Sequence, residues 1–321
     1  MTLSPTAQMR LMNSIPEFTR AAESSGLRCA EAGGAGADVI VWVPAARSAG
    51  RVCGPLSIRA VWGGSETCTI GRRALRIDED NYLVVNGGRE YLVRADGGSA
   101  PESLTIFFSE EAQRSHGLLA RGVPAGASSL ASETHQVFAE HLRPHGDAIS
   151  QFLQRIRDAR CRGVTDNAWY SKQVRMLYAQ LVVSEEELHG RSSIFAPASL
   201  CTRAELFRRV MTATDYINSN FMSSITLDDI AGAALLSKFH LARLFRAFHG
   251  ASPAAYLRAK RIRTAERLIE RSDVDLAEVA ERCGFGSRWS MFRALRRRRG
   301  MSGQRLRQSS VRSMVTTLRA V

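Results

Sequence analysis

Hydrophobic and polar residues alternate in several short segments in the first third of the chain. These segments lie between residues 38 and 110 and are bounded by Gly, Pro, Asn or Asp: DVIVWV, LSIRAVW, RALRI, NYLVV, EYLVRA and SLTIFF. Alternation with a period of two residues is typical of β-strands with one buried face. The Asn86-Gly87 pair between NYLVV and EYLVRA indicates a hairpin. The pattern predicts a small antiparallel barrel or sandwich, whose mouth can hold a small ligand.

Further along the chain, the spacing of apolar residues changes to that of helices. Ile149, Phe152, Leu153 and Ile156 follow the i, i+3, i+4, i+7 pattern of an amphipathic helix. A second helix is predicted over residues 166–188. The two helices either cap the predicted barrel or pack against the same pair in a second subunit. The stretch HGRSSIFAPAS then interrupts helical periodicity, which predicts a linker.

The C-terminal third contains an internal duplication. At an offset of 50, residues from Ser237 to Ser252 match residues from Ser287 to Ser302, and at an offset of 49 the segment around Ile230 matches that around Val279. Each copy predicts a helix, a short turn and a second helix. Candidate N-caps precede these helices at Thr226, Ser237, Asp275 and Ser287. Between the copies, Ser252-Pro253 predicts the start of a spacer helix.

Charge is concentrated in the duplicated region. The chain has 321 residues, enough for two domains, and a net charge of +13. Residues 204–308 contain 20 Lys and Arg against 10 Asp and Glu, a net of +10, whereas the remainder has 24 against 21, a net of +3. Such a local excess is typical of contact with a polyanion, most often nucleic acid, although an anionic membrane surface would also attract it.

Composition argues against several other classes. No apolar run approaches the roughly 18 residues that span a bilayer, and the N-terminus lacks a signal-peptide pattern, so a cytoplasmic protein without a membrane segment is expected. The cysteines lack CxxC spacing, which argues against a zinc module or a disulfide scaffold. We therefore expect free thiols and no cofactor. The six cysteines are Cys29, Cys53, Cys68, Cys161, Cys201 and Cys283.

One cluster of histidine and glutamate residues offers possible metal ligands. It consists of His135, His141 and His145 with Glu133 and Glu140. Helical spacing would be needed to bring these residues to one face, and the proline at position 144 breaks the helical register. A solvated polar face is the favoured interpretation, and no metal site is predicted.

The C-terminal sequence resembles the DNA-binding domain of the AraC/XylS family of bacterial transcription regulators. The resemblance covers about 100 residues, 204–307, in which the Ile230-Ala231 pair, LARLFR, GASPAAYL, RIRTAERL and CGF follow one another in the family's order. It implies an all-α domain with two helix-turn-helix units. The second helix of each unit, over about 237–248 and 287–298, would enter the major groove on successive turns of the duplex, about 34 Å apart.

The sequence departs from the family at four positions. Met291 and Leu295 stand where phenylalanines are usual, and this apolar replacement should be tolerated. Gly303 replaces the usual proline, so the final short helix should begin less sharply. Phe292 stands where a small polar residue is common and should alter the contact that the second helix makes.

The resemblance also selects candidate DNA contacts in the two recognition helices. Arg243 and Arg293 are the strongest, because an arginine can donate two hydrogen bonds to guanine. Phe239 and Ala242 can offer only apolar contact, for instance to a thymine methyl group. The full set is Ser237, Lys238, Phe239, His240, Ala242, Arg243, Arg246, Ser287, Arg288, Trp289, Ser290, Arg293, Arg296 and Arg297.

Each of these assignments has a structural alternative. Leu241, Leu244, Phe245, Met291 and Leu295 repeat at helical spacing and are predicted to be core. The aromatic residues at 239 and 289 would also fit a core. Successive helical residues are about 100° apart, so the four arginines 296–299 cannot all face one groove. The first two of them are predicted to contact phosphates.

The region before the duplication resembles, more weakly, the cupin-like sensing domains found in this family. The rhythm of RRALRIDEDNYLVVNGGREYLVRADGGSAPESLTIFF carries this resemblance. It implies a barrel that binds a small effector and helices that form a homodimer. None of the seven histidines lies between residues 38 and 110, so the metal set of an enzymatic cupin is missing. Pocket candidates are Trp42, Arg59, Trp62, Arg72, Tyr82 and Tyr91, although core packing is the favoured role for the aromatic residues.

The sequence therefore predicts an α+β chain with a cupin-like antiparallel β-barrel and accessory helices followed by an all-α double helix-turn-helix domain. The expected boundaries are 1–36 for an arm, 37–190 for sensing and dimerisation, 191–203 for a linker, 204–308 for DNA binding and 309–321 for a tail. The leading interpretation is a transcription regulator, more often an activator in this family, with promoter DNA and, by resemblance, RNA polymerase as partners. A DNA-targeted repair enzyme with a methyl-accepting cysteine and a nonspecific architectural DNA binder are the alternatives.

Overall fold

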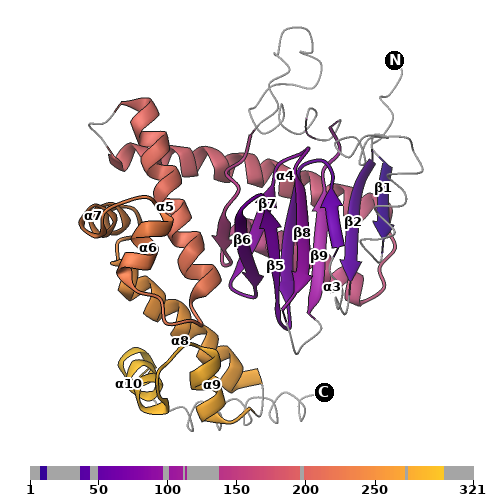
Figure 1. Cartoon of the computed structure of the whole chain (residues 1–321). Helices are drawn as coiled ribbons and strands as arrows, with labels where there is room; N and C mark the ends of the chain where they lie inside the picture. The colour runs from indigo at the N-terminus through magenta and orange to yellow at the C-terminus, as the bar shows by residue number, and fades with distance from the viewer. Residues whose placement is uncertain are drawn as a thin grey trace. The chain divides into compact units, whose positions relative to one another are not determined.

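The computed structural model divides into two compact units, Met1–Ser193 and Ile194–Val321. It describes residues 8–12, 37–43, 50–96, 101–110, 113, 137–195, 199–271 and 274–299. Strands dominate the first unit and helices make up the second (Figure 1). The unit boundary falls inside the predicted linker, while the finer domain limits stay a prediction. Gly303, the tail 309–321 and all of the predicted arm except 8–12 lie outside the described residues.

Two sheets form the N-terminal unit. The larger has the strand order β1 (Gln8–Met12), β2 (Ala37–Val43), β9 (Glu102–Phe107), β4 (Ser57–Trp62), β7 (Asn81–Val85) and β10 (Leu142–Pro144). The smaller has the order β3 (Gly50–Cys53), β8 (Glu90–Ala95), β5 (Ser65–Ile70) and β6 (Arg73–Asp78). The described strand pairs are antiparallel apart from the parallel pair of β1 and β2. The predicted fold class is confirmed, with two separate sheets instead of a closed barrel.

Alternation along the strands creates two apolar cores, because successive side chains point to opposite faces. In β4, Ile58 and Ala60 belong to the core that lies against the helices, whereas Val61 belongs to the core between the sheets. The helices are α3 (Ala148–Cys161) and α4 (Asn167–Gly190), which cover one face of the larger sheet (Figure 1). Both predicted helices are confirmed.

The predicted hairpin at Asn86-Gly87 is wrong. Strand β7 pairs with β4 and β10, while β8 pairs with β3 and β5, so the turn carries the chain from one sheet to the other. The Asn86 side chain donates to the Phe138 carbonyl at 2.7 Å and accepts from the Phe138 N–H at 2.9 Å. The turn residue therefore fixes a segment 52 residues away. A two-residue hairpin instead joins β5 to β6, where Ile70 pairs with Arg73.

The C-terminal unit contains two helix-turn-helix copies, as predicted. A leading helix α5 (Leu200–Asn220) precedes α6 (Leu227–Ala233) and α7 (Lys238–His249); the spacer α8 (Pro253–Arg271) then leads to α9 (Leu276–Arg282) and α10 (Arg288–Arg299). The short 3-10 helix η2 (Arg191–Phe195) lies at the unit boundary. None of the described helices has both the length and the apolar composition that crossing a membrane requires.

Local cap chemistry explains where these helices begin. The Thr226 side chain accepts from the Asp229 N–H, and the Asp229 carboxylate accepts from the Thr226 N–H at 2.8 Å, which completes a capping box. Asp275 caps α9 by accepting from the Ala277 N–H at 2.7 Å. At the start of α8, Ser252 accepts from the Ala255 N–H at 3.3 Å. The predicted caps are therefore present.

Candidate nucleic-acid interface

The two recognition helices, α7 and α10, are built in the same way. Ser237 Oγ accepts from the His240 N–H at 3.3 Å, and Ser287 Oγ accepts from the Ser290 N–H at 3.2 Å. These caps satisfy backbone donors that a helix start leaves without partners. One side of each helix is buried, through Leu241, Leu244, Phe245 and Phe248 in α7 and through Met291 and Leu295 in α10. The replacement of the family's phenylalanines by Met291 and Leu295 leaves a filled core.

The opposite side of each helix carries the predicted DNA contacts. Phe239 is 80% exposed and Trp289 is 71% exposed, so neither aromatic belongs to the core. Large aromatic side chains are seldom this exposed unless the surface binds a partner. Here two of them are exposed at matched positions of the two copies. Among the candidates, Ser237, Lys238, Arg243, Arg246, Ser287, Arg288, Arg293, Arg296 and Arg297 are exposed, while His240, Ala242 and Ser290 are partly buried.

Aromatic and cationic groups cluster on the first two turns of α10. The Trp289 ring lies 6.3 Å from the Phe292 ring in an edge-to-face arrangement, and the Arg288 guanidinium lies 5.9 Å from the centre of the Phe292 ring. Phe292 itself packs against the core of the second copy. It therefore supports the side chains of Arg288 and Trp289 from below.

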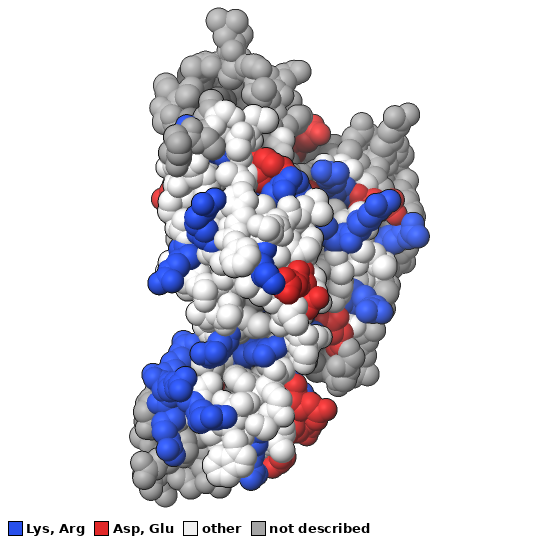
Figure 2. Space-filling model, turned by 60° about the vertical axis from the view of Figure 1, so that its left-hand side comes forward, with Lys and Arg blue, Asp and Glu red and all other residues white. Residues whose placement is uncertain are grey.

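Positive charge on these helices is largely uncompensated. Lys238 lies 3.5 Å from the Asp228 carboxylate, but Arg243, Arg246, Arg293, Arg296 and Arg297 have no hydrogen-bond or ion-pair partner among the residues the structure describes. In the lower part of Figure 2, which is formed by α8, α9 and α10, Lys and Arg side chains gather on one side and Asp and Glu side chains on the other. Such a surface is able to bind an anionic polymer.

A groove between α8 and α10 adds residues that the sequence analysis missed. It has a volume of about 610 Å³ and includes Arg258 and Arg261 of α8 beside Arg293 of α10. The apolar positions of α8 have the spacing of a buried helix, so the sequence predicts only a spacer there. The charged positions between them gave no motif that would mark one wall of a groove.

The six pocket candidates of the N-terminal unit do not gather in one place. Trp42, Trp62 and Tyr82 lie on the side that faces α3 and α4, whereas Arg59 and Tyr91 lie on the side between the sheets. Arg72 is exposed in the turn between β5 and β6. The strands place neighbouring residues on opposite faces, so a set chosen only because strands carry it becomes divided.

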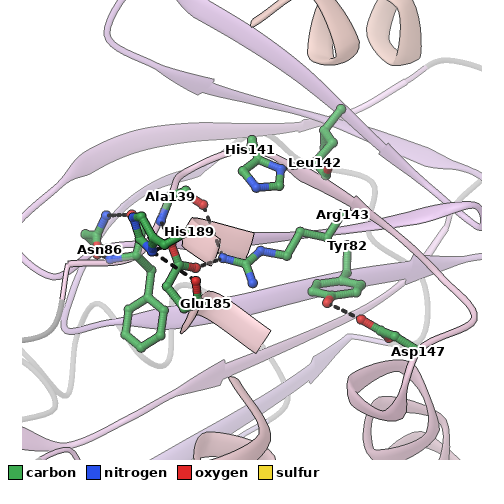
Figure 3. Close-up of polar contacts among 10 residues, drawn as sticks. Tyr82, Asn86, Ala139, His141, Leu142, Arg143, Asp147, Glu185 and His189 are labelled. Carbon is green, nitrogen blue, oxygen red and sulfur yellow. Dashed lines mark hydrogen bonds and ion pairs between the residues drawn. The ribbon is translucent and has the colours of Figure 1, made fainter. Parts of the chain in front are cut away.

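The candidates that are buried already have polar partners. Arg59 Nη2 lies 2.6 Å from the Glu66 carboxylate, and Arg59 Nη1 donates to Thr105 Oγ1 at 2.5 Å. Burial is the largest single influence and lowers the pKa of Arg59, but the charge and hydrogen bond of Glu66, together with Tyr91 and Cys68, raise the pKa overall. Tyr82 donates to Asp147 at 2.6 Å (Figure 3), and burial raises the pKa of Tyr82.

A second buried ion pair joins the edge of the larger sheet to a helix. Arg143 of β10 contacts the carboxylate of Glu185 of α4, and both side chains are buried (Figure 3). Glu185 also accepts from the Ala139 N–H at 2.8 Å and lies 3.6 Å from Nδ1 of His189. The pair thus fixes the segment before β10 against the C-terminal half of α4.

The described members of the histidine and glutamate cluster at 133–145 each have another polar partner. His141 Nδ1 lies 3.1 Å from the Leu142 carbonyl, His145 Nδ1 lies 3.0 Å from Ser150 Oγ, and Glu140 accepts from the Asn86 N–H at 3.0 Å. In the described part of the chain, no three potential ligands come together as a metal site. The other two residues, at 133 and 135, lie outside the described residues.

The paired helices, their caps and their exposed basic faces define a DNA-binding protein of the helix-turn-helix class. A family model described as a helix-turn-helix domain matches residues 230–309. Residues 230–309 thus carry a helix-turn-helix domain, and a putative AraC-like regulator among the relatives supports the resemblance of this C-terminal region to the AraC/XylS family.

Three relatives illustrate the extent of the similarity. A probable transcriptional regulator, LumQ of Photobacterium leiognathi, is 33% identical over 154 residues, or 43% of this chain and 62% of its own. The lactose operon transcription activator of Staphylococcus xylosus is 29% identical, over 24% of this chain and 27% of its own. A putative AraC-like transcription regulator of Streptomyces lividans is 34% identical, over 29% of this chain and 30% of its own.

The similarity thus spans less than two thirds of each of these relatives. All three of these relatives are described as regulators of transcription.

Proposed function

We propose that the protein is a sequence-specific DNA-binding transcription regulator whose helices α7 and α10 enter successive major-groove turns. The observation that carries the proposal is that matched positions of two capped helices expose the same kind of surface, an aromatic residue followed one turn later by an arginine without a partner. Those positions are Phe239 and Arg243 in α7 and Trp289 and Arg293 in α10. A nonspecific architectural DNA binder would need positive charge to bind phosphates, but it would not need the same base-contacting side chains at matched positions of two helices.

The proposal assigns a chemical role to each kind of side chain. Arg243 and Arg293 donate two hydrogen bonds each to guanine, while Phe239 and Ala242 make apolar contact with a thymine methyl group. The remaining polar and charged candidates bind phosphates or nearby base edges and thereby fix the register on the duplex. They are Ser237, Lys238, His240, Arg246, Ser287, Arg288, Ser290, Arg296 and Arg297, with Trp289 stacking beside them.

The N-terminal unit, in this proposal, binds a small effector and pairs two chains into a homodimer. Support comes from its resemblance to cupin-like sensing domains and from the buried Arg59–Glu66 pair, which places polar groups in an otherwise apolar space between the sheets. In this proposal the protein acts in the cytoplasm and activates transcription through contact with RNA polymerase. The lactose operon transcription activator among the relatives supports activation.

Selection of duplexes from a random pool by the full chain tests the DNA-binding part. Binding of the selected duplex at 150 mM salt should be much tighter than binding of random duplex. Arg293→Ala should relax base preference at one position and cost about 1–3 kcal/mol there. Arg282→Ala is the matched control, because Arg282 is an exposed arginine of α9 that is paired with Glu278. Equal affinity of the wild type for all duplexes would refute the proposal and favour an architectural binder.

A thermal-shift screen of metabolites on the full chain tests the effector part. A ligand that binds the folded N-terminal unit stabilises it in proportion to the logarithm of its concentration. A metabolite that also changes affinity for the selected duplex would support a sensor, whereas stabilisation without any effect on DNA binding would contradict that role.

A further inference from the structure

The groove between α8 and α10 is a basic channel with an apolar floor. Its floor includes Leu257, Ile262, Phe285 and Ala294, and the residues that line it include five arginines and no acidic residue. The arginines are Arg258, Arg261, Arg293, Arg297 and Arg298. Like charges that line one groove repel one another, and an anion bound between them would lower this repulsion.

Two of these arginines have partners within the fold. Arg261 donates to the carbonyl oxygens of Phe221 and Ser223, both at 2.7 Å, and burial lowers the pKa of Arg261. Arg298 lies 3.9 Å from the Glu266 carboxylate. Arg258, Arg293 and Arg297, by contrast, are exposed and have no polar partner among the described residues. Three guanidinium groups therefore remain available at the mouth of the groove.

The groove wall contributed by α10 is the same side that is proposed to read bases. Ser290, Arg293 and Arg297 follow one another at spacings of three and four residues, so they share one side of the helix. A helix in the major groove, which is about 12 Å wide, has one sugar-phosphate strand on each side. With α8 forming the opposite wall, the strand on that side would run between α8 and α10.

We propose that this groove receives one sugar-phosphate strand of the bound duplex, with Arg258 of α8 and Arg297 of α10 binding phosphates from opposite walls. The apolar floor contacts the deoxyribose. Arg258 is thus a positioning residue: it reads no base, but it sets how far α10 enters the major groove. This inference rests on the proposed function, since it requires α10 to occupy the major groove.

Salt dependence of DNA binding by the full chain tests the role of Arg258. Each phosphate contact contributes about 0.9 to the slope of log affinity against log salt. Between 50 and 200 mM salt, wild type should therefore lose about 3.5-fold more affinity than Arg258→Gln. Arg258→Lys should restore the slope, and Arg263→Gln, on the same helix but outside the groove, should leave it unchanged.

Neutral backbone substitution locates the contact. Single methylphosphonates placed along the strand between the two half-sites should weaken wild-type binding at one or two positions, and the same substitutions should have no effect on Arg258→Gln. Equal effects on both proteins, or an unchanged slope in Arg258→Gln, would overturn the groove assignment while leaving sequence-specific binding intact. Loss of wild-type preference for the selected duplex would overturn both. Suppression of DNA binding by millimolar inorganic phosphate at constant ionic strength, without any methylphosphonate effect, would assign the groove to a free anion and overturn the proposal.

Discussion

Replacing Gly284 with alanine should destabilise the second helix-turn-helix by about 3 kcal/mol. Gly284 has φ +71°, and a Cβ atom there would lie 2.5 Å from the carbonyl oxygen of Phe221 and 2.8 Å from that of Met222. The left-handed conformation costs an alanine about 1–2 kcal/mol. Separating the crowded backbone atoms costs about 1–3 kcal/mol more, as in other overpacked sites. Reduced freedom of the unfolded chain offsets about 0.4–1 kcal/mol of this.

Gly250→Ala provides the matched control. Gly250 has φ +70° at the end of α7, but a Cβ there would meet nothing within 4 Å. Gly250→Ala should therefore lower the free energy of unfolding by about 1 kcal/mol. This is the cost of the left-handed conformation less the gain from the reduced freedom of the unfolded chain. Hydrogen exchange of the full chain, followed by mass spectrometry on peptides from each copy, gives the free energy of opening for each variant. Equal losses in the two variants would refute the reasoning, because they would mean that the close approach to residues 221 and 222 costs nothing.

Two further predictions concern ion pairs. Arg59→Met should cost about 3–5 kcal/mol in urea unfolding, because it leaves Glu66 buried without its partner, whereas the double variant Arg59→Met with Glu66→Leu should cost clearly less; a double variant as unstable as the single one would contradict this. Hydrogen bonds from Arg208 and Arg209 to the Glu205 carboxylate lower the pKa of Glu205 to about 2. The ionised carboxylate therefore stabilises the folded state above pH 4.5, the ordinary pKa, and this stabilisation is lost as the pH falls toward 2. An NMR titration should place this pKa near 2 in the wild type and nearer 4.5 in Arg208→Gln; identical values would exclude the pairing in solution.

The C-terminal unit could be predicted closely because its signals are local. The capping residues at 226, 237, 275 and 287 act on backbone groups two or three positions away, so sequence spacing alone identifies them. The duplication doubled this information, since each copy confirmed the pattern of the other. Burial of Met291 and exposure of Trp289 then follow from helical periodicity.

The N-terminal unit was less predictable because strand pairing joins distant residues. The Asn86-Gly87 turn has the composition of a hairpin, but Asn86 instead binds Phe138, and no local rule identifies that partner. Four strands, β1, β3, β5 and β10, were missed. β5 has the polar sequence SETCTI, and β10 has three residues. Likewise, alternation places Arg59 on the inner side of β4 but cannot name Glu66 as the residue that compensates its charge.

The two copies differ in the number of basic residues on their second helices and agree where folding requires it. Both turns use a left-handed residue, Leu235 with φ 53° and Gly284 with φ 71°, and both then return a backbone N–H to the preceding helix, from Leu236 at 3.0 Å and from Phe285 at 2.8 Å. Helix α7 has one lysine and two arginines, whereas α10 has six arginines in the same length of 12 residues. The buried side of each helix is constrained by packing, whereas the number of charged residues on the exposed side can differ between the copies without disturbing the fold. The unequal charge of the two helices is therefore not set by the requirements of folding.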